Sequence, residues 1–163
     1  MSMTASDVQQ YQETYRAAAS EYLGVEVQAA GILQRPGVVA GMVGAKAGGS
    51  FGGLLGRSLG RRLAKVGSPD APEGLPTQVL VACTDHDVHA LAFERKGSGV
   101  RITSRVRTWP RAAMGAGTRT PGRLADQLAI PLSDGTSINL DSPHMPGAAI
   151  DFNQPLLEAL GVW

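Results

Sequence analysis

The chain has 163 residues, of which 43% are hydrophobic and 21 are glycine, enough for one domain with a modest core and appendages. A single cysteine, Cys83, excludes an internal disulfide and a cysteine-based zinc cluster. The formal net charge is +1, but six basic residues and no acid lie between Arg35 and Lys65, and eight and no acid between Arg95 and Arg123, after which five acids and no base follow. We therefore expect separate basic and acidic faces, which suit self-association or an anionic partner.

The N-terminal segment predicts an amphipathic helix within residues 1–22. Ser6 and Asp7 are typical of a helix start, and Gly24 is typical of a helix end. One helical stripe of this segment carries three tyrosines, which we interpret as a docking face onto the domain: Tyr11, Tyr15 and Tyr22. The preceding sequence is polar and has neither a basic nor an apolar signal-peptide region, so we expect a cytoplasmic protein.

The remainder of the chain predicts short strands separated by turns. A first strand is expected at 25–33, where apolar and polar residues alternate, and further strands at 77–83, 88–94 and 100–108. Residues 114–117 fit a weak strand or a loop, and the strands at 124–132 and 136–140 flank an Asp134-Gly135 hairpin turn. Asp151 is expected to cap a final helix. The sequence therefore predicts an α+β fold: a half-open antiparallel β-barrel of about seven strands with a C-terminal helix, an N-terminal helix and a glycine-rich insert.

The insert at 37–76 carries glycine at every fourth position: Gly44, Gly48, Gly52, Gly56 and Gly60. On a helix this spacing removes side chains from one face, so that another backbone can pack closely against it. Four readings remain open: a mobile loop, close helix packing within the chain or between subunits, a helix on an anionic membrane, and a membrane span. Lys46 near the middle of the segment argues against the span.

Two groups of basic residues predict an anion- or lipid-binding surface. The strand at 100–108 alternates, which places one set of three on a single face: Arg101, Arg105 and Arg107. Guanidinium groups in such a row can bind phosphate oxygens, although a solvated face that protects a sheet edge has the same pattern. The second group lies beside an apolar side of the insert: Arg57, Arg61 and Arg62. Nucleic acid fits less well, because no aromatic residues alternate with the basic ones.

Other patterns that could support chemistry are weak. Two Gly-x-Ser-x-Gly motifs, at 48–52 and 56–60, lie within glycine-rich sequence, and the chain is too short for a hydrolase of that type. His86 and His89 lie among aspartates, but their sequence reads as a turn that enters a strand, without a known metal-ligand spacing. Cys83 lies in an apolar strand and is expected to be buried. We predict no enzyme activity, no cofactor and no metal.

Several segments together resemble bacterial pleckstrin-homology-like domains of small actinobacterial proteins: Leu23-Gly24-Val25, residues 79–94, Trp109-Pro110-Arg111, residues 128–141 and residues 153–160. The resemblance covers roughly residues 23–34 and 77–161 and implies a barrel domain over 23–161, interrupted by the insert at 37–76. Two departures are His86, which stands where the family has arginine, and the insert itself. The resemblance implies a binding or scaffold module without fixing its ligand.

We therefore expect a non-enzymatic interaction or scaffold module that binds a protein partner or itself. It could also bind anionic lipid at the inner face of the plasma membrane through its basic residues and insert. The alternative is a homo-oligomeric structural protein or accessory subunit packed through the glycine face. A small metal-binding enzyme that uses His86 and His89 is the third expectation.

Overall fold

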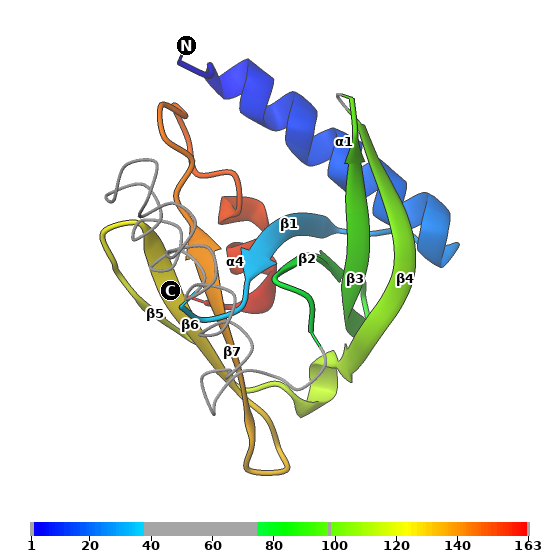
Figure 1. Ribbon diagram of the computed structural model, residues 1–163. Coiled ribbons are helices and arrows are strands. Elements are labelled where there is room, and N and C mark those ends of the chain that lie inside the picture. The colour runs from blue at the N-terminus through cyan, green and yellow to red at the C-terminus, as the bar shows by residue number, and fades with distance from the viewer. Residues whose placement is uncertain (1, 38–74, 98, 163) are drawn as a thin grey trace, which may run out of the picture.

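A computed structural model describes residues 2–37, 75–97 and 99–162 (Figure 1). Over these residues the fold is α+β: two helices, α1 (Ala5–Leu23) and α4 (Gln154–Leu160), and one open antiparallel sheet of seven strands. The strands are β1 (Ala29–Gln34), β2 (Gln78–Cys83), β3 (Asp87–Lys96), β4 (Gly99–Pro110), β5 (Thr118–Thr120), β6 (Ala125–Pro131) and β7 (Ser137–Pro143). A short 3-10 turn, η1 (Arg111–Ala113), follows β4. The predicted α+β class, the seven antiparallel strands and the two terminal helices are therefore confirmed.

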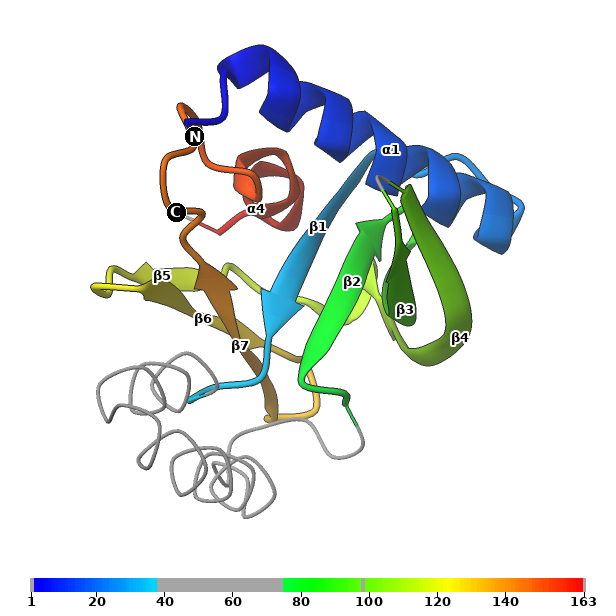
Figure 2. The same cartoon turned by 45° about the horizontal axis from the view of Figure 1, so that its top comes forward.

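The sheet has the strand order β4-β3-β2-β1-β7-β6-β5 and divides into two groups at its centre. β1 pairs with β2 along its whole length, but it pairs with β7 only between Gln34 and Asp141. In Figure 2, β5–β7 lie at a steep angle to β1 and β2, while α4 lies beside β1 and below α1. The sheet is therefore strongly bent where β7 leaves β1, and its two edges are β4 and β5.

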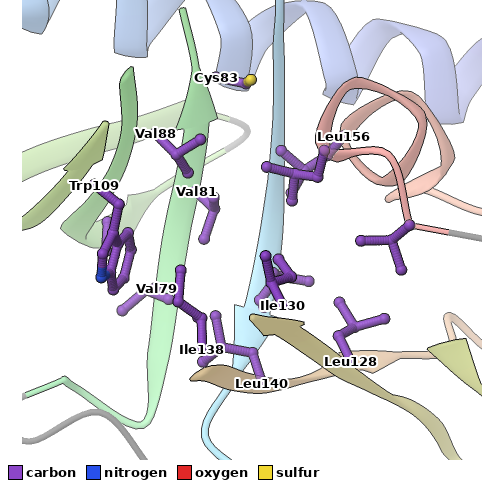
Figure 3. Close-up of a cluster of buried hydrophobic side chains, with 14 of the residues drawn as sticks. Val79, Val81, Cys83, Val88, Trp109, Leu128, Ile130, Ile138, Leu140 and Leu156 are labelled. Atoms are coloured by element: carbon purple, nitrogen blue, oxygen red, sulfur yellow. The ribbon is translucent and has the colours of Figure 1, made fainter. Parts of the chain in front are cut away.

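Two apolar clusters on opposite faces of β1 and β2 form the core. The barrel cluster lies inside the bend of the sheet, where Val79, Val81 and Trp109 meet Leu156 of α4 (Figure 3). The helix cluster lies between the sheet and α1, and contains Leu80, Leu91 and Tyr15. β1 and β2 are buried on both faces for this reason, which explains the continuous apolar run at 79–83.

Helix α1 is capped at both ends. Thr4 accepts a hydrogen bond from the main-chain N–H of Asp7, whose carboxylate accepts in return from the N–H of Thr4, and Gly24 ends the helix with φ +69°. The predicted start at Ser6 and Asp7 was therefore two residues late. The tyrosine docking face was also wrong in part, because Tyr15 is 7% exposed but Tyr11 and Tyr22 are 39% and 44% exposed. Only Tyr15 packs inward, edge-on against Phe93 and Phe152.

Several predicted boundaries shift by a few residues. β1 begins at Ala29 rather than at residue 25, since the chain from Gly24 first crosses over to the sheet. Residues 114–117 hold only isolated bridges, at Met114 and Gly117, and the strand comes after them as β5. Asn153, rather than Asp151, precedes α4, whereas Asp151 accepts a hydrogen bond from the main-chain N–H of Asn153. The Asp134-Gly135 hairpin turn between β6 and β7 is confirmed, with Gly135 at φ +88°.

Candidate functional site

The three arginines of β4 do not share one face, in contrast to the prediction. The pairing of β3 with β4 shifts register twice, between Ala90 and Leu91 and between Ala92 and Phe93. Arg101 and Arg107 stand opposite Glu94 and Ala90, whereas Arg105 stands opposite Leu91, whose side chain belongs to the helix cluster on the other face. Directly opposed residues point to the same side of a sheet, so the two bulges place Arg105 on the opposite face from Arg101 and Arg107.

The same bulges divide the apolar residues of β4 between the two faces of the sheet. Val100 and Ile102 pack against the helix cluster, while Val106 packs against the barrel cluster. A strictly alternating strand would place Ile102 and Val106 on the same side. The bulges therefore allow one edge strand to contribute to both apolar clusters.

The hairpin of β3 and β4 is strongly basic, and we call its five basic residues the basic ribbon: Arg95, Lys96, Arg101, Arg105 and Arg107. Only two acids, Asp87 and Glu94, lie on the same two strands. Arg101 pairs with Glu94 at 2.9 Å, with both side chains 63% exposed, so this ion pair contributes little to stability. The ribbon therefore carries a net positive charge along the β4 edge of the sheet.

A second feature is a pocket of about 340 Å³ at the C-terminal end of α1, which we call the α1 pocket. It is lined by Leu23, Val25, Glu26, Thr84, Asp85, His86, Asp87, His89 and Arg105. The end of α1 and the segment after it supply Leu23, Val25 and Glu26. The other polar side chains come from the turn between β2 and β3 and from the start of β3, and Arg105 reaches the pocket from β4. Its volume is at the lower end of the range for small-molecule sites.

His89 lies at the wall of this pocket and is only 5% exposed. Its Nδ1 atom lies 3.0 Å from the hydroxyl oxygen of Thr108, directly across the β3–β4 pair. Burial lowers the pKa of His89, the charge of Asp87 opposes this effect, and the charge of Arg105 adds to it. The imidazole is therefore neutral at pH 7.

The described part of the chain contains no group of three or more His, Cys, Asp or Glu side chains close enough to hold a metal ion. His86 and His89 are both at the α1 pocket, as their spacing allowed, but they do not form such a group with the neighbouring aspartates. Cys83 is fully buried, as expected, and burial raises the pKa of its thiol, with a smaller opposing effect from Arg111. The thiol is therefore protonated and weakly nucleophilic.

An ion-pair network that was not predicted joins β5, β6 and the segment between β7 and α4. Arg119 donates to Asp126 at 2.6 Å and to Asp151 at 2.8 Å, and His144 Nε2 lies 2.8 Å from Asp126. Burial alone would raise the pKa of Asp126, but hydrogen bonds from His144, Arg119 and the Gly122 N–H outweigh it, so the pKa is lowered. The signal was the alternation of β6, which places Asp126 inward in phase with Leu128 and Ile130.

The remaining predicted site residues, Arg57, Arg61 and Arg62 and the glycines at 44, 48, 52, 56 and 60, lie outside the described residues. Both Gly-x-Ser-x-Gly motifs also lie there. Among the helices that the structure describes, none has the length and apolarity to cross a membrane. The chain matches no protein-family model, no curated protein and no solved structure.

Proposed function

We propose that this protein is a non-enzymatic binding module with a pleckstrin-homology-like barrel, which attaches to an anionic membrane surface through the basic ribbon. The support for the barrel is the strand order, in which a four-stranded and a three-stranded group meet at β1 and β7, and α4 packs its leucines into the barrel cluster. The segments that resemble the family fall on the end of α1, on β2–β4, on β6 and β7, and on α4.

The observation that carries the membrane proposal is the charge of the basic ribbon. Five basic and two acidic residues lie on one hairpin at an edge of the sheet. β2 pairs with β3 only from Val88 to Leu91, so the rest of the hairpin extends beyond β2. Beyond Leu91 the hairpin therefore pairs with no described strand other than its own two, and its apolar side chains pack beneath α1.

The bulges of β4 fit a surface better than a compact phosphate site. Because Arg105 lies on the opposite face from Arg101 and Arg107, the three guanidinium groups do not converge on one small anion. A hairpin with basic residues on both faces can still lie along a charged plane, where each basic residue near the surface contributes about 1 kcal/mol. The basic residues of the insert, Arg57, Arg61 and Arg62, would add to the same attraction.

The test is flotation of the purified chain with phosphatidylserine–phosphatidylcholine vesicles and with pure phosphatidylcholine vesicles, at several salt concentrations. We expect binding to the anionic vesicles that weakens as salt is added. The variant Arg95→Gln/Lys96→Gln should bind about thirtyfold more weakly, because two contributions of about 1 kcal/mol are removed. The matched control Arg16→Gln/Arg123→Gln removes the same charge outside the ribbon and should bind like the parent chain.

A chain without residues 37–66 tests the contribution of the insert in the same assay. Equal loss of binding in the ribbon variant and its control would contradict the proposed surface, and no flotation with either vesicle would overturn the membrane role. In that case sedimentation of the full chain tests the alternative function, a homo-oligomer packed through Gly44, Gly48, Gly52, Gly56 and Gly60. A dimer or larger assembly would support that alternative.

A further inference from the structure

The α1 pocket is acidic, in contrast to the basic ribbon. Three carboxylates line it, those of Glu26, Asp85 and Asp87, against one guanidinium group, that of Arg105. With His89 neutral, acidic groups therefore outnumber basic ones at its wall. An ion of positive charge is favoured in such a place, because the partly enclosed walls weaken the screening by water.

The three carboxylates of the pocket differ in whether they already have a hydrogen-bond partner. Asp85 accepts a hydrogen bond from the side-chain amide of Gln28, which itself accepts from Arg111 at 3.0 Å. The side chains of Glu26 and Asp87, in contrast, make no hydrogen bond or ion pair with any residue that the structure describes. These two carboxylates are therefore available to a ligand.

His89 supplies an independent observation. Its Nδ1 atom is occupied by Thr108, but its Nε2 atom has no hydrogen-bond partner within the described part of the chain. The ring is 95% buried, but Nε2 is not fully enclosed, so this atom, which has no protein partner among the described residues, stays accessible at the pocket wall. When Nδ1–H donates to the Thr108 hydroxyl, Nε2 is an acceptor at the pocket wall, ready for an N–H donor.

The apolar part of the wall fits the stem of such a donor. Leu23 and Val25 line the pocket directly, and Val25 is 51% exposed although it is a branched aliphatic residue. A long side chain or alkylamine could lay its methylene groups on these residues and place its charged end among the carboxylates. The guanidinium group of Arg105 also lines the pocket and reduces its net negative charge.

We propose that the α1 pocket binds an ammonium or guanidinium group on an apolar stem, with Glu26 and Asp87 as counter-ions and His89 Nε2 as a hydrogen-bond acceptor. The cationic group belongs either to a lysine or arginine side chain of a protein partner or to a free alkylamine. Both sources present the same chemistry, and the experiment below separates them.

The test is NMR titration of the full chain with butylammonium and butylguanidinium, with butyrate as the anionic control. We expect saturable shifts of the amide signals of residues 84–87 and of the His89 ring nitrogens with the two cations only. The variant Glu26→Gln/Asp87→Asn should weaken this binding by at least about tenfold, because hydrogen bonds to charged groups are lost. The matched control Asp134→Asn/Glu158→Gln removes the same charge outside the pocket and should leave the binding unchanged.

Titration with a blocked tripeptide, acetyl-Gly-Lys-Gly-amide, distinguishes the two sources. Binding at least as tight as that of butylammonium supports a protein side chain, and weaker binding supports a free amine. Absence of saturation with either cation at millimolar concentrations would overturn the proposal, as would tighter binding of butyrate or equal weakening in the two variants. An unchanged His89 Nε2 resonance in the saturated complex would overturn the role of the imidazole.

Discussion

The side-chain amide of Asn153 hydrogen-bonds both main-chain groups of Ile32: its Oδ1 accepts from the Ile32 N–H and its Nδ2 donates to the Ile32 carbonyl, each at 2.9 Å. Nδ2 also lies 3.0 Å from the hydroxyl oxygen of Ser142. β7 pairs with β1 only between Gln34 and Asp141, so at Ile32 it no longer pairs with β1. The amide thus substitutes for a neighbouring strand at the point where the sheet divides.

Asn153→Ala should destabilise the protein strongly, because it leaves the Ile32 N–H and C=O without partners in a fully buried place. At about 1–3 kcal/mol for each of the two unpaired groups, we expect a loss of about 2–6 kcal/mol in the free energy of unfolding. Urea unfolding followed by circular dichroism measures it. Asn139→Ala is the control, since Asn139 accepts from the exposed Ser137 hydroxyl, and its loss should be clearly smaller. Equal losses would contradict the role assigned to Asn153.

Gly31→Ala should destabilise the protein through the same amide. A Cβ atom at this position would lie 2.5 Å from Asn153 Oδ1 and 2.9 Å from Leu156 Cδ2, so both side chains would have to move. Overpacking of this kind typically costs about 1–3 kcal/mol. Because the displaced amide also loses its bonds to Ile32, the double variant Gly31→Ala/Asn153→Ala should lose less than the sum of the single losses. Additive losses in the same unfolding assay would exclude this coupling.

Asp141→Asn should stabilise the protein at neutral pH. Burial raises the pKa of Asp141, and the hydrogen bond from the Gly37 N–H at 3.1 Å offsets this only in part. Within the described residues, the buried Gln34 Oε1 lacks a hydrogen-bond partner, and Gln34 stands directly opposite Asp141. An asparagine can accept from Gly37 and donate to Gln34, a gain of about 1 kcal/mol, the size of one net hydrogen bond.

The stability gained by Asp141→Asn should depend on pH. A carboxyl group with a raised pKa in the fold contributes stability below its unfolded pKa of about 3.9, and that contribution is lost as the pH rises through the folded value. The advantage of Asp141→Asn should therefore be largest near pH 7 and shrink as the pH approaches about 4. Asp134→Asn is the control, since hydrogen bonds from Thr136 lower the pKa of that exposed carboxyl. A variant less stable than the parent chain at neutral pH would refute the prediction.

Arg119→Gln should destabilise the protein, and the loss of stability should be largest near neutral pH. The substitution removes the guanidinium group that pairs with Asp126, whose side chain is 7% exposed, and with Asp151. Leaving a largely buried carboxylate without its cation should cost about 2–4 kcal/mol near neutral pH. Since the folded pKa of Asp126 is depressed, its contribution is present above the unfolded pKa and is lost as the pH falls through the folded value. The stability difference should thus narrow below about pH 4, and a constant difference in urea unfolding would count against the ion pair.

Local signals in the sequence predicted most of the fold. The Asp134-Gly135 turn, the alternation of β6 and the glycine at position 24 each depend on neighbours in the chain. The faces of β4 were not predictable in this way, because its two bulges exist only in the register with β3. For the same reason the prediction that Arg101, Arg105 and Arg107 share one face was wrong, although all three are exposed.

The candidate site was harder to predict than the fold. The α1 pocket combines residues 23–26, residues 84–89 and Arg105, which come together only once α1 has packed across the sheet. No single segment of these three carries a binding motif. His86 and His89 were identified as a pair, but the availability of His89 Nε2 depends on Thr108 in the paired strand.

The pairing of Gln34 with Gln78 at the ends of β1 and β2 has a practical consequence. The chain leaves the described fold at Gly37 and re-enters it at Leu75, and the Arg35 N–H still donates to the Thr77 carbonyl at 3.1 Å. The pairing of β1 with β2 thus holds together the two points at which residues 38–74 are inserted. The entropy of closing a loop grows only with the logarithm of its length. A reporter domain with neighbouring termini could replace residues 38–74 without a change in strand order, so that this fold could serve as a scaffold for domain insertion.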